Sequence, residues 1–367
     1  MKILHTADWQ IGMAARHVGA GGAQVRAQRI ASAKALAAIA KQHGVDAVFV
    51  AGDVFEDNAV DRSDVQRVID ACAAFGVPTY VLPGNHDPLV PGSVWEHPSW
   101  SSAPNVTVLR TAQPIEMAPG VLLYPCPAFS KMSTIDPTAW ISDQSHEGTR
   151  IGIAHGTVTG AMVAEDCFPI RPDAATARGL DYLALGHWHS TAPYEGDLIA
   201  ARMAYSGTHE TTKFGERDSG NILIVDVPGR GGVPTLTRVN TGTLKWYQLA
   251  REIGGSVDVE SVIHEIDSLP HPECSLLELK LSGIVVPSQL GELDRLRGIV
   301  ETRFPLLGRY DDTALATAPE DQAWTDALPA GLLRDVASRI RVGDSDSAAL
   351  ALMLLYRYAL EAGEVAA

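Results

Sequence analysis

Short apolar runs alternate with longer amphipathic segments along the first part of the chain. Residues 2–7, 47–51 and 79–82 are apolar enough for buried strands. Between them, residues 24–43 and 61–75 carry apolar side chains at helical spacing. The order strand, helix, strand, helix, strand predicts a parallel sheet with right-handed crossovers.

After Pro104 the pattern changes to short strands. Pro119 and Gly120 separate two of them and predict a hairpin. The three final strands alternate like an antiparallel meander. The predicted strands cover residues 106–109, 115–117, 121–124, 150–154, 182–185, 221–227, 235–240 and 246–251. We therefore predict an α/β domain over residues 1–251, built as a two-sheet sandwich flanked by helices.

A second module is expected to follow. Residues 255–312 predict a small α+β capping domain, with helices at 257–269 and 288–304 around a strand at 275–281. The polar stretch 313–326 is typical of a linker. Residues 327–367 predict a C-terminal helical segment with two helices, 332–340 and 347–362. The pattern leaves open whether these helices pack on their own domain or dock on a partner.

Composition narrows the class of protein. The 367 residues contain no apolar run long enough to cross a membrane, and the start of the chain lacks the pattern of a secretory signal, so a cytoplasmic protein is expected. The four cysteines are scattered singly, which argues against a disulfide framework and a thiolate zinc site. The formal charge of −15 is unfavourable for nucleic-acid binding unless metal ions or a partner supply positive charge.

Clusters of Asp, Asn and His stand where predicted buried strands end. Carboxyl ends of strands in such sheets converge, so these clusters are expected to form one site. Carboxylates, an amide oxygen and imidazoles suit Mn²⁺, Fe²⁺ or Zn²⁺, and the lack of a thiolate favours manganese. One cluster alone would be typical of a turn or a structural histidine, but all five in this order point to a metal centre. They are Asp8-Trp9-Gln10, Gly52-Asp53, Gly84-Asn85-His86-Asp87, His155-Gly156 and Gly186-His187-Trp188-His189.

This order of clusters resembles the signature of the calcineurin-like metallophosphoesterase superfamily. Residues 3–9, Ile-Leu-His-Thr-Ala-Asp-Trp, and the later Tyr205-Ser206-Gly207 resemble the SbcD-type subunits of DNA double-strand-break repair nucleases. The resemblance implies two divalent metal ions, most readily Mn, with Fe, Zn or Mg as alternatives. A hydroxide activated between the two ions would attack the phosphorus of a phosphodiester.

The resemblance also assigns roles to individual residues. Asp53 would bridge the two ions, and His86, which would not bind metal, would face the scissile phosphodiester and assist by contacting the phosphate or by donating a proton. Glu56 would orient His86 through its carboxylate, although a solvated loop glutamate is an equally good interpretation. The metal ligands would be Asp8, Gln10, Asp53, Asn85, His155, His187 and His189, and the residues behind them or beside the substrate would be Glu56, Asp87, Tyr205 and Ser206.

Gln10 departs from the pattern, because the family has histidine at this place. A glutamine carbonyl oxygen is neutral and a poorer donor than imidazole. The site could therefore be an active one with a shifted metal preference, a slow one, or one reduced to phosphate binding. Because the other ligands are intact, we favour an active enzyme.

Three functions follow from these observations. The first is a Mn-dependent DNA exonuclease and endonuclease that works in DNA repair, as a homodimer with an SbcC-like ABC ATPase. The second is a stand-alone phosphodiesterase or phosphatase for nucleotides or other small phosphoesters, for which an acidic surface matters less. The third is a non-catalytic DNA- or partner-binding subunit in which Gln10 has removed the activity.

Overall fold

A computed structural model describes residues 1–142, 147–160, 167–193, 201–254, 257–318, 322, 324–341 and 346–362. The chain divides into two compact units. The first consists of Met1–His17 and Gly22–Leu244, and the second of Val18–Gly21 and Lys245–Ala367. Within the described part of the chain, no helix has the length and apolar character that a bilayer crossing requires.

A six-stranded sheet forms one layer of the first unit. In spatial order its strands are β11 (Thr235–Asn240), β10 (Asn221–Asp226), β1 (Lys2–Thr6), β2 (Ala47–Ala51), β3 (Thr79–Leu82) and β4 (Val106–Val108). The strands β1 to β4 are parallel, which confirms the predicted parallel sheet. Strands β10 and β11 join antiparallel at the other edge.

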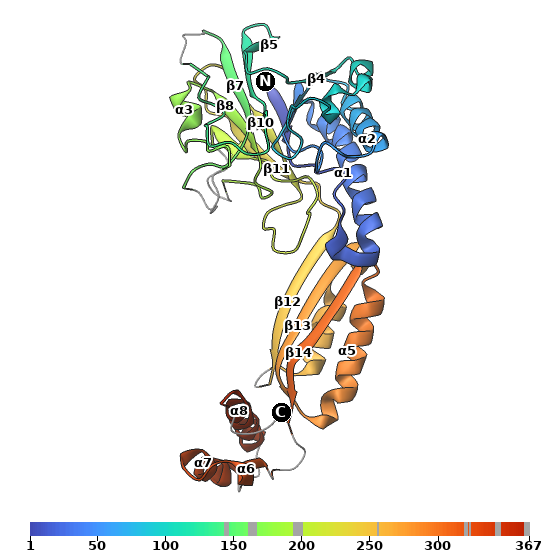
Figure 1. Ribbon diagram of the computed structural model, residues 1–367, viewed down its shortest axis with the longest axis vertical. Helices are drawn as coiled ribbons and strands as arrows, with labels where there is room; N and C mark the ends of the chain where they lie inside the picture. Colours follow the sequence, from blue (N-terminus) through green and yellow to red (C-terminus); the bar gives the residue numbers. More distant parts are fainter. Residues whose placement is uncertain are drawn as a thin grey trace. The chain divides into compact units, whose positions relative to one another are not determined.

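Two helices, α1 (Gly22–His43) and α2 (Arg62–Ala73), cover one face of this sheet (Figure 1). Alternation along the strands explains the arrangement, because every second side chain points to the same face. Leu4 and Val48 pack in one buried cluster with Leu36 of α1 and Ile69 of α2. The other face of the sheet is therefore free to meet a second sheet.

The second sheet has five strands: β5 (Ile115–Ala118), β6 (Val121–Cys126), β7 (Thr149–His155), β8 (Tyr182–Gly186) and β9 (Met203–Tyr205). As predicted, β5 and β6 form an antiparallel hairpin, and the remaining pairs are parallel. Ile3 and Phe49 of the first sheet share a buried core with Ile151 and Ile153 of the second. The predicted two-sheet sandwich is thus confirmed. Short helices add to the loops: η1 (Arg16–Gly21), η2 (Val94–Glu96), η3 (Pro98–Ser102) and α3 (Ala174–Ala177).

A three-stranded parallel sheet organises the second unit: β12 (Lys245–Ile253), β13 (Ser275–Val285) and β14 (Leu307–Thr317). Two helices, α4 (Val259–Ser268) and α5 (Leu290–Arg303), pack on it through Ile266 and Leu296 against Leu277. The prediction that residues 246–251 close the meander of the first domain is wrong. Alternating apolar and polar residues indicate a strand with one buried face, but they do not indicate its neighbour in the sheet. In the structure, β12 pairs with β13. The short turns are η5 (Pro272–Cys274) and η6 (Pro287–Gln289).

The predicted linker at 313–326 is also partly wrong, because β14 continues to Thr317. The residues of β14 are mostly only half-buried, because the strand lies at the edge of the sheet. Polar residues at such positions resemble those of a loop in the sequence. The two predicted terminal helices are present, as α7 (Leu332–Arg341) and α8 (Asp346–Glu361), after a short α6 (Trp324–Ala327). Residues 255, 256, 319–321, 323, 342–345 and 363–367 of the predicted modules lie outside the described residues.

Candidate metal centre

The ends of five strands or the loops after them supply the predicted ligands. Asp8 follows β1, Asp53 follows β2 and Asn85 follows β3, whereas His155 ends β7 and His187 follows β8. Both sheets of the sandwich therefore contribute predicted ligands to the same site. Asp53, His155 and His187 offer ligand atoms that all lie within 4.8 Å of one another.

His155 shows the character of this cluster most clearly. Its Nδ1 lies 2.9 Å from the backbone oxygen of Ala51, which only accepts hydrogen bonds. Its Nε2 faces two more acceptors, Asn85 Oδ1 at 2.9 Å and Asp53 Oδ2 at 3.2 Å. With Nδ1–H donating to Ala51, a neutral ring turns a lone pair towards two oxygen atoms. Such a group of acceptors needs a cation, and its oxygen and nitrogen donors fit a divalent metal ion.

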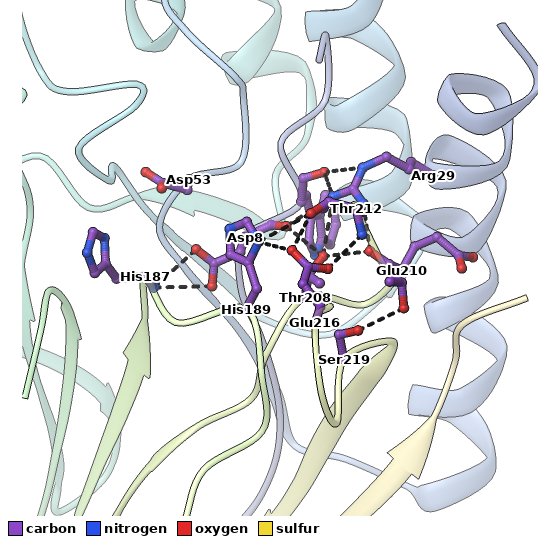
Figure 2. A network of polar contacts seen from close by, with 12 residues as sticks. Asp8, Arg29, Asp53, His187, His189, Thr208, Glu210, Thr212, Glu216 and Ser219 are labelled. Atoms are coloured by element: carbon purple, nitrogen blue, oxygen red, sulfur yellow. Dashed lines mark hydrogen bonds and ion pairs between the residues drawn. The ribbon is translucent and has the colours of Figure 1, made fainter. Parts of the chain in front are cut away.

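His187 completes the same group. Its Nδ1 lies 3.0 Å from Asn85 Oδ1, so the amide oxygen is shared between two imidazoles. The backbone N–H of His187 donates to both carboxylate oxygens of Asp8, each at 3.1 Å. In Figure 2, Asp8 lies between Asp53 and His187 on one side and a polar network around Arg29 on the other.

Electrostatics agree with a cation site. Burial lowers the pKa of His155, but the charge and hydrogen bond of Asp53 outweigh burial and raise it to about 9. Burial raises the pKa of Asp53, yet His155 holds it well below its usual range. Burial raises the pKa of Asp8 to about 6, while burial and the nearby His155 lower that of His187 to about 4. A position that stabilises a proton on His155 also stabilises the charge of a metal ion.

The backbone of the ligand loops is unusual. Asp8, Gln10, Asp53 and His187 have φ values of 54°, 43°, 49° and 107°. Non-glycine residues seldom adopt this left-handed region, and such outliers concentrate at functional sites. Asp and His tolerate it better than most residues, whereas Gln10 gains no such advantage.

His86 lies at the rim of the cluster, with 39% of its side chain exposed. Its backbone N–H donates to Asp53 Oδ1 at 2.9 Å, and its Nε2 lies 4.0 Å from Asp53 Oδ2. The ring Nδ1 contacts the backbone oxygen of Glu56 at 3.0 Å. The predicted orientation of His86 by the Glu56 carboxylate is therefore corrected, because the contact comes from the backbone oxygen of Glu56.

Asp87 is fully buried behind the ligands. Its carboxylate accepts hydrogen bonds from the backbone N–H groups of Phe55 at 2.8 Å and Gly84 at 2.7 Å. Burial and the charge of Asp53 raise its pKa to about 8. It joins the loops after β2 and β3 and so fixes the distance between the ligands they carry.

Tyr205 and Ser206 do not face a substrate, which corrects the prediction for both. The Tyr205 hydroxyl donates to the oxygen of Gly156 at 2.7 Å and accepts from the N–H of Val158 at 2.8 Å. It therefore holds the loop after His155. Ser206 has no exposed surface, and its hydroxyl donates to the oxygen of Gly207. A Tyr-Ser-Gly motif identifies the residues, but it does not show in which direction their side chains point.

Gln10 is buried and lines a cavity of about 520 Å³ together with residues of α1 and the start of α2, among them Arg26 and Arg67. Its position beside Asp8 places it next to the cluster, because its N–H donates to the backbone oxygen of Asp53 at 2.9 Å. Ligation of metal by its side chain stays a prediction.

His189 is held by a residue that sequence reasoning missed. Its Nδ1 lies 2.6 Å from Glu216 Oε1, which leaves Nε2 for another partner. A carboxylate behind a histidine is the usual way to fix the ring of a metal ligand. Burial lowers the pKa of His189, but this hydrogen bond and Asp8 raise it overall. Glu216 belongs to no recognisable motif and lies 27 residues after His189 in the chain, so only the folded structure reveals the contact.

Arg29 of α1 is the second missed residue (Figure 2). It is 1% exposed and donates to the backbone oxygens of Asp8 at 3.2 Å, Trp9 at 3.1 Å and Glu210 at 2.6 Å. Thr208 Oγ1 also lies 2.9 Å from the oxygen of Asp8. Burial lowers the pKa of Arg29 to about 10, so it remains charged. The network fixes the strained turn that carries Asp8.

The chain can be compared with known proteins by sequence and by structure. It is 27% identical over 214 residues to the uncharacterized metallophosphoesterase YhaO of Bacillus subtilis (strain 168), covering 55% of this chain and 50% of that protein. It thus spans about half the length of this relative. Among solved structures, TT1561 of Thermus thermophilus aligns over 65% of this chain and 98% of its own, with 11% identity and a TM-score of 0.42. The calcineurin-like phosphoesterase YfkN from Bacillus subtilis aligns over 66% and 90%, with 11% identity and a TM-score of 0.39.

Residues 1–191 match the calcineurin-like phosphoesterase family, and this match contains every ligand predicted from the sequence. The chain therefore belongs to the calcineurin-like phosphoesterases, a family of metal-dependent enzymes that hydrolyse phosphoesters.

Proposed function

We propose that this protein is a manganese-dependent DNA nuclease subunit of the SbcD type, which hydrolyses phosphodiester bonds with two metal ions. The observation that carries the proposal is the partly exposed His86 at the rim of the cluster of Asp53, Asn85, His155 and His187. This arrangement offers a hydrogen-bonding imidazole where a bound phosphodiester would lie.

The residues fit a pair of divalent ions. Asn85, His155 and His187 would hold one ion, Asp8, Gln10 and His189 the other, and Asp53 both. When bound, such ions withdraw charge from phosphoryl oxygens and lower the pKa of water. Glu216 fixes the ring of His189, and the oxygen of Ala51 fixes that of His155, so each histidine would keep Nε2 for an ion.

His86 would act on the substrate. Donation from Nδ1–H to the oxygen of Glu56 fixes the ring, and Nε2 remains on the side of Asp53. From there it would contact a non-bridging oxygen of the phosphodiester and give a proton to the leaving oxygen. This role requires a partly exposed ring, and His86 is more exposed than His155 and His189, whose side chains are 0% and 21% exposed.

DNA as the substrate and an SbcC-like ABC ATPase as partner are supported by the resemblance of residues 3–9 and 205–207. The helices α7 and α8 expose Leu332, Leu333, Leu354 and Tyr358, an apolar set suited to a docking element. We propose a homodimer that binds the ATPase through these helices.

A small phosphoester is the second candidate substrate. The net charge of −15 favours it, because an acidic surface repels a polyanion more than it repels a nucleotide.

The test is hydrolysis of a labelled double-stranded oligonucleotide and of bis(p-nitrophenyl) phosphate, each with Mn²⁺, Mg²⁺ or EDTA. We expect Mn²⁺-dependent cleavage of both, lost in Asp53→Ala. Lys41→Ala, an exposed change at the end of α1, is the control and should cleave as wild type. Cleavage of the small ester alone, even after addition of the ATPase, would move the assignment to the second candidate. Inactivity on both substrates would refute an enzymatic function.

A further inference from the structure

A second cavity opens directly beside the metal centre. Its volume is about 490 Å³, which falls within the roughly 300–1,000 Å³ typical of small-molecule pockets. Two site histidines form one wall, and a loop between β9 and β10 forms the other. The lining residues are His187, Trp188, His189, Ser190, Lys213, Phe214, Gly215, Glu216 and Arg217.

This loop is fastened to the metal centre. Glu216 accepts hydrogen bonds from His189 Nδ1 at 2.6 Å and from the backbone N–H of Thr212 at 2.8 Å. Its position next to His189 therefore does not depend on a bound molecule. Anything that lies in the cavity is also adjacent to a predicted metal ligand.

The side chains on its walls are aromatic and cationic. Trp188 packs on the core of the second sheet, and Phe214 is half-buried in the opposite loop. Lys213 and Arg217 are exposed on either side of Phe214. The acid in the lining, Glu216, is turned to His189 and Thr212, whereas the two cations of the lining are exposed.

We propose that this cavity is a nucleotide subsite, which binds the base next to the scissile phosphate against Trp188 and Phe214. Lys213 and Arg217 contact the adjoining phosphate. The inference rests on the proposed hydrolysis of nucleic acid and specifies how the strand is held. Stacking on aromatic rings tolerates any base, whereas the cations recognise the backbone. The local positive charge also explains how a chain of net charge −15 accepts a polyanion at this place.

The test measures binding rather than turnover. A phosphorothioate-linked thymidine dinucleotide and its abasic counterpart are titrated calorimetrically into the Mn²⁺-loaded protein. We expect Phe214→Ala to weaken binding of the dinucleotide about tenfold and to leave the abasic ligand within about twofold. Phe214→Leu, which keeps bulk but removes the ring, should behave in the same way. Trp188→Ala should do likewise, and Phe129→Ala, an exposed aromatic outside the cavity lining, is the control.

The cations are tested by salt. Lys213→Ala combined with Arg217→Ala should weaken both ligands and lower the slope of log affinity against log salt, whereas Lys41→Ala should not. Equal losses for both ligands in Phe214→Ala, or no loss, would overturn the base subsite. Base-dependent binding in a protein that cleaves no phosphodiester would instead overturn the proposed nuclease function and leave the subsite standing.

Discussion

Replacing Gly84 by alanine tests whether the position of Asp53 controls the metal centre. Gly84 precedes Asn85 and His86, and its backbone passes close to Asp53. A methyl group at this position would lie 2.2 Å from Asp53 Oδ1 and 2.3 Å from the Asp53 backbone nitrogen. Non-bonded atoms normally approach to about 3.5 Å, so Asp53 or the loop must move by about 1 Å.

A shift of this size has a large expected cost. Misplacement of a catalytic group by about 1 Å lowers the rate about 100-fold, equivalent to about 2.7 kcal/mol of transition-state stabilisation. Asp53 is predicted to contact both ions, so the affinity for Mn²⁺ should fall together with the rate. The assay is kcat/KM on bis(p-nitrophenyl) phosphate, with Mn²⁺ binding followed by calorimetry and the fold by circular dichroism.

The matched control is Gly298→Ala on α5, where an added methyl group meets no atom within 4 Å. Its rate and Mn²⁺ affinity should equal those of the wild type. A folded Gly84→Ala protein with unchanged kcat/KM and unchanged Mn²⁺ affinity would refute the reasoning, because the carboxylate would then tolerate displacement.

Three further changes probe separate parts of the molecule. His86→Gln should lower kcat about 10²- to 10⁴-fold without loss of bound metal, and unchanged kcat would exclude a role in catalysis. Gln10→His should tighten binding of one Mn²⁺ roughly tenfold, or about 1.4 kcal/mol; no change in calorimetry would show that residue 10 is not a ligand. Burial and Arg29 lower the pKa of His209 from 6.5 to about 3 in the folded protein, so below pH 6.5 the unfolded chain takes up a proton that the folded chain does not. From about pH 7.5 to about pH 5.5 this residue should cost about 1.4 kcal/mol of stability, so in urea unfolding the wild type should lose about 1.4 kcal/mol more than His209→Gln over this range.

The types of the candidate ligands were predictable from the sequence because the chemistry restricts them. A metal centre needs carboxylate, amide and imidazole groups, and parallel strands bring their ends together, so Asp8, Asp53 and His187 stand out at strand ends. The first sheet was predictable from the order of apolar and amphipathic segments, and the hairpin of the second from Pro119 and Gly120 between two short strands. Each of these conclusions depends on a local pattern.

Partners distant in the sequence were not predictable in this way. The alternation in residues 246–251 indicates a strand, yet pairing with β13 follows from contacts some 30 residues away. Glu56 was identified for its carboxylate, but the structure uses its carbonyl, which every residue has. Tyr205 and Ser206 lie near the site but are directed into the protein. At the end of a strand, the sequence pattern does not show whether a side chain points into the protein or towards the site.

Arg29 illustrates why the support of the site escapes sequence reasoning. The turn carrying Asp8 and Gln10 places both residues in the left-handed region, which costs of order 1–3 kcal/mol for each strained residue. The surrounding structure must offset this cost, and here a buried guanidinium binds the carbonyl oxygens of Asp8 and Trp9. A lysine offers no planar fork of donors for several carbonyls at once, so the geometry requires arginine. Yet the N–H groups of Arg29 donate to backbone atoms, and Arg29 lies on a helix 20 residues after Trp9. In the sequence, an arginine among polar helix positions cannot be told from an exposed one. The ligands of such a site are therefore visible in the sequence, while the residues that hold them in place become visible only in the fold.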